Sequence, residues 1–273
     1  MNKVALTIGL LADPHVAGGA YANRYCDQSL AKLADCIGAF VERRVDMIVN
    51  LGDAIDGVEG GSMGPREHLE SVRQAVARFD GPKHLVLGNH DVDCLTKAEM
   101  IVLAGCEAAQ AYYSFDAAGL HFVVLDTNNY ADGADFTPTD HPEYWGDAWL
   151  GGPQLDWLAD DLAGAGGRGT VVFAHAGLDH HEVDGRRDPH CIIDGPAVRE
   201  LLARAGNVRA VFQGHYHTGR SCVQGGISYV TLAAMCEGPY PQTAYAVATI
   251  HTDGAITVEG AGQQESIELP QQK

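Results

Sequence analysis

Residues 4–15 read Val-Ala-Leu-Thr-Ile-Gly-Leu-Leu-Ala-Asp-Pro-His, an apolar run that stops at Asp13. The run from Val4 to Ala12 has the length and composition of a buried β-strand. Residues 29–44 then place apolar side chains at helical spacing, and Met47 to Leu51 forms another short apolar run. A strand, an amphipathic helix and a second strand in this order predict a layered α/β fold.

The alternation of strands and helices continues along the chain. A helix is predicted from Pro65 through Phe79 and a strand over 85–87. Beyond Ala111 the pattern changes to paired strands over 112–115 and 120–126, which indicates a second sheet. Further helices are predicted over 154–163 and 196–205, and further strands over 170–174, 208–212, 227–232, 244–250 and 255–258. Residues 127–152 read as a long ordered loop and are a candidate lid.

Length and composition favour one globular domain over residues 1–273. The formal charge of −18 disfavours nucleic acids and anionic membranes as partners, and the sequence leaves the oligomeric state open. No signal peptide or membrane span is recognisable, so a cytoplasmic location is expected. Seven cysteines without a C-x-x-C pair are expected to be reduced thiols.

Five short motifs place possible metal ligands where predicted strands end. They are Asp13-Pro14-His15, Gly52-Asp53-Ala54-Ile55-Asp56-Gly57, Gly88-Asn89-His90-Asp91, Ala174-His175-Ala176 and Gly214-His215-Tyr216-His217. In layered α/β folds the carboxyl ends of the strands meet at one crevice, so distant motifs can supply one site. Each motif alone also fits an ordinary turn, but five in this order favour a shared site.

The donor atoms in these motifs are oxygens and imidazole nitrogens, which suit manganese, iron or zinc. Seven ligands are too many for one catalytic ion with an open position, so the count favours two divalent ions about 3.5–4 Å apart with Asp53 as the bridge. The seven are Asp13, His15, Asp53, Asn89, His175, His215 and His217.

Together the motifs D-x-H, G-D-x-x-D, G-N-H-D, a lone histidine and G-H-x-H resemble the calcineurin-like metallophosphoesterase superfamily from Asp13 to His217. The resemblance implies a four-layer α-β-β-α sandwich of two mixed sheets flanked by helices. It also implies that Asp13, His15, Asp53 and His217 surround one ion, and that Asp53, Asn89, His175 and His215 surround the other.

Two cations would supply a bridging hydroxide that attacks phosphorus in line, and would let an acidic protein hold an anionic substrate. His90 remains once the ligands are assigned and follows Asn89, so it is the candidate proton donor to the leaving oxygen. Asp56 resembles the family carboxylate that orients this histidine.

Looser matches resemble the manganese-dependent ADP-ribose/CDP-alcohol diphosphatase branch. They include Asn23-Arg24-Tyr25, Tyr112-Tyr113-Ser114-Phe115 and the C-terminal strands. That branch often has Gln where this chain has His15. Asn23, Arg24 and Tyr25 are candidate substrate contacts: Arg24 could pair with phosphate, and Tyr25, Tyr130 or Trp145 could stack on a base, although a solvated arginine and packed aromatics fit equally well. His180, His181 and Cys191 could border the pocket or face solvent.

Three functions remain open from the sequence. The first is a phosphohydrolase acting on phosphodiester or phosphoanhydride bonds of small nucleotide-type molecules. The second is a phosphomonoesterase of broad or protein specificity, with a cyclic nucleotide phosphodiesterase as a related alternative. The third is a binding module without catalysis, which the complete ligand set and His90 disfavour.

Overall fold

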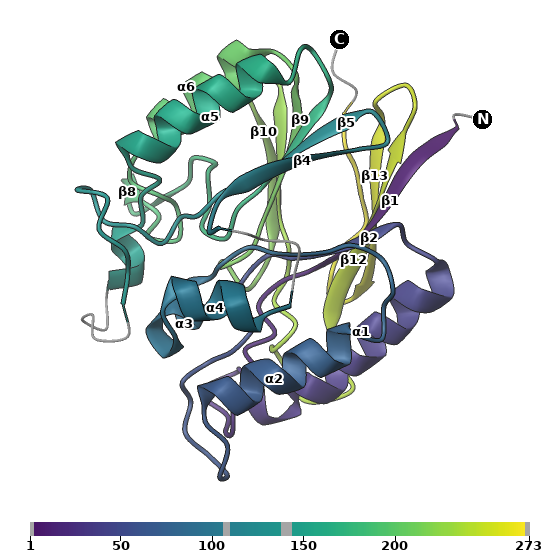
Figure 1. Ribbon diagram of the computed structural model, residues 1–273, viewed down its shortest axis with the longest axis vertical. Helices are drawn as coiled ribbons and strands as arrows, with labels where there is room; N and C mark the ends of the chain where they lie inside the picture. Colours follow the sequence, from purple (N-terminus) through teal and green to yellow (C-terminus); the bar gives the residue numbers. More distant parts are fainter. Residues whose placement is uncertain (1–2, 106–109, 138–143, 271–273) are drawn as a thin grey trace.

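The computed structural model describes residues 3–105, 110–137 and 144–270. Two six-stranded mixed sheets pack face to face, and helices cover the outer face of each (Figure 1). The chain therefore forms a four-layer α-β-β-α sandwich, which confirms the predicted fold class.

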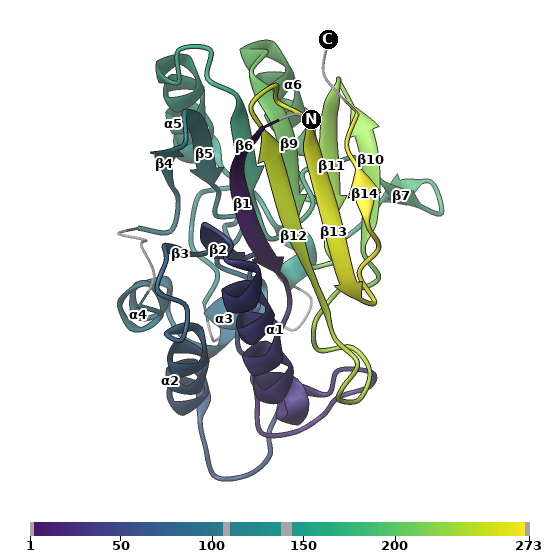
Figure 2. The ribbon, with the colours of Figure 1, turned by 90° about the vertical axis from the view of Figure 1, so that its right-hand side faces the viewer.

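The first sheet contains both ends of the described chain. Its strand order is β14 (Ile267–Glu268), β13 (Ile256–Gly262), β12 (Ala244–His251), β1 (Val4–Leu11), β2 (Met47–Asn50) and β3 (Lys83–Leu85). Strands β1, β2 and β3 are parallel, and β12 pairs antiparallel with β1. Helices α1 (Ser29–Arg43) and α2 (Pro65–Val76) lie on the outer face (Figure 2). The close approach of α1 requires Gly9, since a Cβ there would lie 2.8 Å from the Phe40 ring.

The second sheet begins with β4, as the paired strands beyond Ala111 predict. Its order is β10 (Arg220–Gln224), β11 (Ile227–Thr231), β9 (Val208–Gln213), β6 (Thr170–Phe173), β5 (Leu120–Val124) and β4 (Tyr113–Ala117), with β5, β6 and β9 parallel. Helices α5 (Gly152–Gly164) and α6 (Gly195–Ala205) form the outer layer. The remaining elements are η1 (Cys26–Gln28), α3 (Asn89–Cys94), α4 (Lys97–Leu103), η2 (Tyr144–Asp147), β7 (Glu182–Val183) and β8 (Arg186–Arg187).

Alternate residues of β1 face the two sides of the first sheet. Ile8 and Leu10 are fully buried against the second sheet, whereas Leu11 packs in the core beneath the helices. This burial on both sides explains why β1 reads as a continuous apolar run. Across the second sheet, Phe173 stacks with both Phe122 and Phe212 at ring-centroid distances of 6.1 and 6.2 Å.

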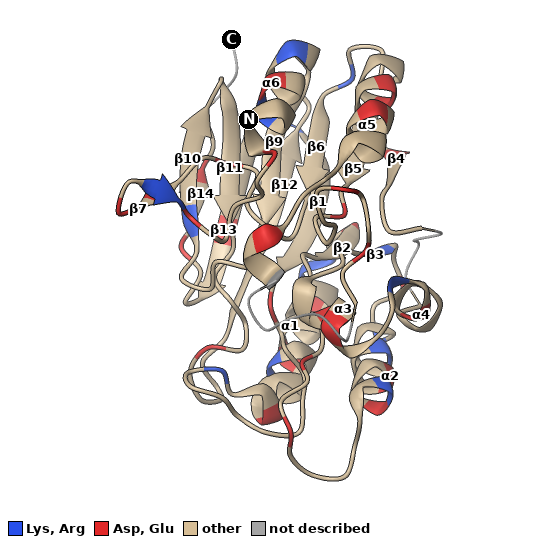
Figure 3. Ribbon diagram, turned by 90° about the vertical axis from the view of Figure 1, so that its left-hand side faces the viewer, with Lys and Arg blue, Asp and Glu red and all other residues tan. Residues whose placement is uncertain are grey.

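Several predicted boundaries were wrong. The third strand covers Lys83–Leu85 rather than 85–87. Val86 still donates its backbone N–H to Asn50 at 2.9 Å, and Val86 and Leu87 are both buried. Helices α3 and α4, strands β10 and β14 and the β7–β8 hairpin were not predicted, since short segments carry too little periodicity. Within the described ranges, no helix is long and apolar enough to cross a membrane. Acidic residues lie on helices of both outer layers (Figure 3).

Candidate metal centre

The five motifs meet at one edge of the sandwich. They follow β1, β2, β3, β6 and β9, all of which belong to the parallel parts of the two sheets. Asp13, Asp53 and His175 are each no more than 1% exposed, and Asn89 and His215 are also buried. The fold therefore brings together donors separated by up to about 200 positions in the sequence.

Asp53 lies at the middle of this cluster. Its Oδ2 is 3.4 Å from Nε2 of His15 and 3.3 Å from Nε2 of His175. Among the described residues this buried oxygen has no hydrogen-bond partner, and Nε2 of His215 is likewise unpaired. Asp53 belongs to two groups of mutually close ligand atoms, one with Asp13 and His15 and the other with His175 and His215. Buried lone pairs without a hydrogen-bond partner around a shared carboxylate suit divalent cations, because a cation would bind them.

Two of the imidazoles are held at Nδ1 by carboxylates. Nδ1 of His15 is 2.8 Å from Oδ2 of Asp56, and Nδ1 of His217 is 2.8 Å from Oε1 of Glu237. Ionised carboxylates can only accept, so the imidazoles donate these bonds. Although burial opposes it, the bond from His15 lowers the pKa of Asp56, and the bond from His217 lowers the pKa of Glu237. The Nε2 atoms are then directed toward one another, 3.2 Å apart. This is the tautomer that metal-binding histidines need.

His175 has the same arrangement with a backbone acceptor. Its Nδ1 is 2.8 Å from the carbonyl oxygen of Leu51, and its Nε2 is 3.1 Å from Oδ1 of Asn89. The sequence indicated Asp56 only as the carboxylate that orients His90, and it did not indicate any of these Nδ1 acceptors. Glu237 in particular follows β11 with no recognisable motif around it.

Four of the seven candidate ligands have backbone in the left-handed region. The φ angles are 53° at Asp13, 49° at His15, 52° at Asp53 and 69° at His215. Residues with side chains rarely adopt these angles, and such strain persists at functional sites where the surrounding structure enforces it.

The glycines of the motifs make room for the ligands themselves. A Cβ at Gly88 would lie 2.1 Å from Oδ1 of Asp53, and a Cβ at Gly52 would lie 2.5 Å from Nδ1 of His175. Gly52 also has a φ of 106°. Close packing therefore requires glycine at both positions, and at Gly52 the backbone conformation requires it as well.

Burial favours neutral imidazole at two positions of the cluster. Burial lowers the pKa of His15 to about 4 and that of His215 well below its usual value. Burial alone would raise the pKa of Asp53, but His175 and His15 outweigh it and hold this pKa well below its ordinary range. Although burial opposes protonation of His175, Asp53 raises the pKa of this residue to about 9. An ionised carboxylate beside neutral imidazoles is a donor set that cations bind.

His90 lies at the edge of the cluster with its ring reaching the cleft. Its backbone N–H donates to Oδ1 of Asp53 at 2.8 Å. Ring Nδ1 is 3.3 Å from Asp93 and 3.7 Å from Asp56, and Nε2 is 3.1 Å from the Arg24 guanidinium. Although burial opposes it, Asp53, Asp93 and Asp56 raise the pKa of His90 to about 9. Asp56 is predicted to orient His90, but its shortest contacts are with His15 and Arg24, at 2.8 and 2.7 Å. The carboxylate nearer to His90 is that of Asp93.

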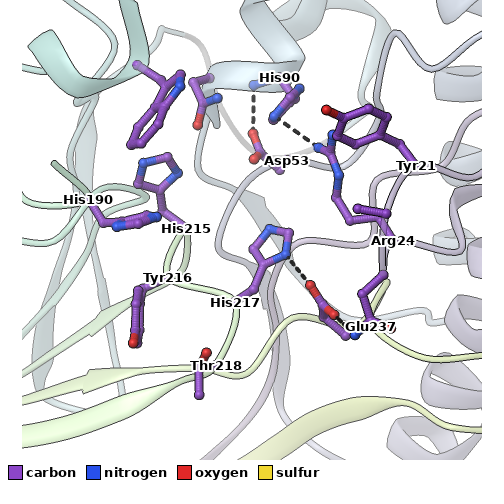
Figure 4. Close-up of a pocket in the computed structure, with 14 residues that line it drawn as sticks. Tyr21, Arg24, Asp53, His90, His190, His215, Tyr216, His217, Thr218 and Glu237 are labelled. Atoms are coloured by element: carbon purple, nitrogen blue, oxygen red, sulfur yellow. Dashed lines mark hydrogen bonds and ion pairs between the residues drawn. The ribbon is translucent and has the colours of Figure 1, made fainter. Parts of the chain in front are cut away.

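A cleft of about 430 Å³ opens over the cluster (Figure 4). It is lined by Tyr21, Ala22, Asn23, Arg24, Asp53, Asn89, His90, Trp145, His190, His215, Tyr216, His217, Thr218 and Glu237. Of the candidate substrate contacts, Asn23 and Arg24 line the cleft and Tyr25 does not. Trp145 also lines it, whereas Tyr130 packs against Phe136 at a ring-centroid distance of 4.7 Å.

The loop that carries Trp145 is tied to the body of the protein at its base. Nζ of Lys97 donates to Asp126 at 2.6 Å, Asn129 at 2.8 Å and Asp135 at 2.7 Å. Residues 138–143 of the candidate lid lie outside the described residues. The described part thus places an anchored loop and one aromatic ring beside the cleft.

The other histidines after His175 contact a different cluster. His181 is 2.7 Å from Asp179, in a group with Cys222, and Arg220 lies 3.4 Å from the same carboxylate, where its charge competes with any cation. His180 pairs with Glu182 at the surface, and Cys191 is buried. None of His180, His181 and Cys191 lines the cleft.

Residues 6–219 match the family model described as calcineurin-like phosphoesterase. The chain belongs to this family. It is a metal-dependent phosphoester hydrolase, as the five motifs predict.

Two curated relatives of this phosphoesterase are named manganese-dependent ADP-ribose/CDP-alcohol diphosphatase. The one from Oryza sativa subsp. japonica is 23% identical over 276 residues, covering 86% of this chain and 83% of the relative. The one from Danio rerio is 23% identical over 323 residues, covering 98% of this chain and 99% of the relative. The fold of this phosphoesterase is similar to that of a dimetal phosphatase from Danio rerio, with a TM-score of 0.81, 21% identity and coverage of 98% and 99%.

Proposed function

We propose that this phosphoesterase uses two divalent metal ions to hydrolyse phosphoanhydride or phosphodiester bonds in small nucleotide-type substrates. The observation that carries the proposal is the position of Asp53, which is shared by both groups of ligand atoms and has an unpaired buried oxygen. One ion would be held by Asp13, His15, Asp53 and His217, and the other by Asp53, Asn89, His175 and His215. These oxygen and imidazole donors suit manganese or iron and are compatible with zinc.

Such a pair of ions supplies an activated water molecule and the positive charge that attack on phosphorus needs. His90 would give a proton to the leaving oxygen, because its ring reaches the cleft beside Asn89. Arg24 presents a guanidinium that could bind phosphate oxygens. Asp56 would position both His15 and Arg24 through the bonds described above.

The size of the cleft supports a small substrate. About 430 Å³ is within the range of small-molecule sites. Asn23, Tyr21 and Trp145 at its walls offer an amide and two aromatic rings for the part of the substrate beyond the phosphate. The two relatives named as ADP-ribose/CDP-alcohol diphosphatases support the same substrate class. In this proposal the loop over 127–152 acts as a lid that bears Trp145.

The test compares substrates on protein stripped with a chelator and reloaded with manganese, iron or zinc. ADP-ribose, CDP-choline, a cyclic nucleotide, p-nitrophenyl phosphate and a phosphopeptide are supplied in parallel. We expect manganese-dependent release of AMP from ADP-ribose and CMP from CDP-choline, with about two ions bound per chain. An Asp53→Asn variant should bind fewer ions and lose turnover.

Two results would contradict the proposal. Stoichiometric binding of a single ion in the active protein would remove the two-metal mechanism. Turnover of p-nitrophenyl phosphate or the phosphopeptide, but not of the nucleotide-linked diphosphates, would favour the phosphomonoesterase instead.

A further inference from the structure

The tripeptide Asp-Pro-His occurs twice in the chain, first at residues 13–15 in the candidate metal centre and again at residues 188–190. The second copy follows β8 and places His190 in the wall of the cleft. Figure 4 shows His190 and His215 on one side of the cleft, and Arg24 and Tyr21 on the other. Nothing in the proposed two-metal mechanism uses His190.

The orientation of the His190 ring is set by a buried carboxylate. Oδ1 of Asp188 accepts the backbone N–H of His190 at 3.0 Å and lies 2.8 Å from ring Nδ1. Oδ2 of Asp188 accepts from the guanidinium of Arg220 at 2.6 Å. Burial alone would raise the pKa of Asp188, but these hydrogen bonds lower it to about 2. An ionised Asp188 can only accept, so Nδ1 of His190 carries a proton and Nε2 is the atom left for another partner.

Neighbouring rings hold the imidazole on its other sides. Its centroid is 5.1 Å from that of His215, 5.2 Å from Trp145 and 5.2 Å from Tyr216. The side chain is still 31% exposed. No residue in the described parts of the chain is hydrogen-bonded to its Nε2. The ring is therefore fixed in orientation, adjacent to a candidate metal ligand and accessible from the cleft.

We propose that His190 is a substrate-binding residue whose Nε2 hydrogen-bonds an oxygen of the substrate on the wall opposite His90 and Arg24. The inference rests on the proposed function, since it assumes that the reacting phosphate lies over the candidate ligands. A ring that served only as packing would not need a buried Asp188 paired with a half-buried Arg220, because desolvating charges is costly. The same pair is well suited to hold an imidazole in one tautomer and direction.

Two isosteric variants separate substrate binding from packing. The amide of asparagine overlaps the Nδ1 side of histidine, whereas the amide of glutamine reaches the Nε2 position. His190→Asn therefore keeps a partner for Asp188 and removes the substrate contact, and His190→Gln does the reverse. The control is His180→Asn, which lies before the β7–β8 hairpin at the surface beside Glu182.

The measurements are kcat and KM on the manganese-loaded protein with ADP-ribose and with bis(p-nitrophenyl) phosphate, together with manganese content and Tm. We expect His190→Asn to lower kcat/KM by about 10- to 100-fold, the loss of one hydrogen bond to a charged group. The loss of kcat/KM in His190→Gln should be several-fold smaller than the loss in His190→Asn. Both variants should bind manganese as the wild type does, and His180→Asn should match the wild type throughout.

Equal losses in the two variants, a greater loss in His190→Gln, or no loss in either would overturn the inference. Loss of manganese or a drop in Tm in step with activity would assign His190 a structural role and overturn it as well. Wild-type turnover of bis(p-nitrophenyl) phosphate but not ADP-ribose would reject the proposed substrate class while still testing His190. If the wild type turns over neither compound, the proposed function fails, and calorimetric binding of inorganic phosphate to the same variants decides the role of His190.

Discussion

Oε1 of Glu237 lies 2.8 Å from Nδ1 of His217, and this contact connects the loop after β11 to the candidate metal centre. The hydrogen bond from His217 is the main reason that the pKa of Glu237 lies below its usual range. Asn23 also donates to this carboxylate. Glu237 would thus be a positioning residue that directs Nε2 of His217 toward the metal.

Replacing Glu237 should weaken metal binding. We expect Glu237→Met to reduce manganese affinity about 10- to 100-fold, because His217 loses the acceptor that fixes its tautomer. Glu237→Gln keeps an acceptor without the charge, so its loss of manganese affinity should be smaller. Chelator competition measures both, and Glu200→Gln on the exposed face of α6 is the charge-matched control. Wild-type affinity in Glu237→Met would show that His217 needs no such partner.

Lys32 holds the loop that carries Glu237. Its buried Nζ contacts the carbonyl oxygens of residues 235, 236, 237 and 238 at 2.6–3.2 Å. Lys32→Met should lower the free energy of unfolding by about 3 kcal/mol or more, since several buried carbonyls lose their donor. It should also weaken manganese binding, because Glu237 moves with the loop.

The control for this prediction is Lys83→Met. Lys83 likewise contacts two backbone carbonyls, of Phe79 and Gly81, at the start of β3, whereas the motif of residues 88–91 follows the end of that strand. Urea denaturation and metal analysis should show a smaller loss of stability and unchanged manganese content. If Lys32→Met binds manganese normally, the loop does not depend on Lys32 for its position at the metal centre.

Gly88→Ala should disrupt the metal centre through sterics alone. The backbone angles at Gly88, φ −96° and ψ 167°, suit alanine, so the conflict is steric: a Cβ there would lie 2.1 Å from Oδ1 and 2.2 Å from the backbone N of Asp53. We expect loss of bound manganese and of turnover, together with about 1–3 kcal/mol of destabilisation. The matched control is Gly38→Ala within α1, where a Cβ would meet nothing within 4 Å. The free energy of unfolding of that variant should rise by about 0.5–1 kcal/mol, and the variant should keep its manganese.

His84 should make stability depend on pH in mildly acidic solution. The residue is buried on β3 with its ring 3.9 Å from that of Phe115, and burial lowers its pKa to about 4. Between about pH 6.5 and 4 the unfolded chain binds a proton here that the folded chain does not. The stabilisation is therefore complete above about pH 6.5 and is lost as the pH falls toward 4, by about 1.4 kcal/mol per pH unit.

The measurement is the free energy of unfolding of the wild type and of His84→Asn from pH 4 to 8. The difference between the two proteins should change by about 3 kcal/mol across this window, with the wild type losing more on acidification. If the free energies of unfolding of the two proteins change in parallel with pH, His84 titrates equally in the folded and unfolded states.

Much of the fold was predictable from local patterns. Strand β1 follows from a continuous apolar run and helix α1 from hydrophobic periodicity, and both patterns depend only on near neighbours along the chain. The return of β12 to pair with β1 was not predictable, because pairing across more than 200 positions leaves no local signal. The same reason applies to His190, which was not predicted as a site residue and which the structure places in the cleft.

The amino-acid sequence by itself determined which donors are available, since Asp13, Asp53, Asn89 and His215 are recognisable in short motifs after apolar runs. Only the tertiary structure decided how they act together. It brings the two ligand groups onto one carboxylate, forces Asp13 and His215 into left-handed backbone, and supplies acceptors such as Glu237 that direct each imidazole. The physical reason is that motifs record chemistry and local conformation, whereas orientation and strain arise from packing between segments distant in the chain.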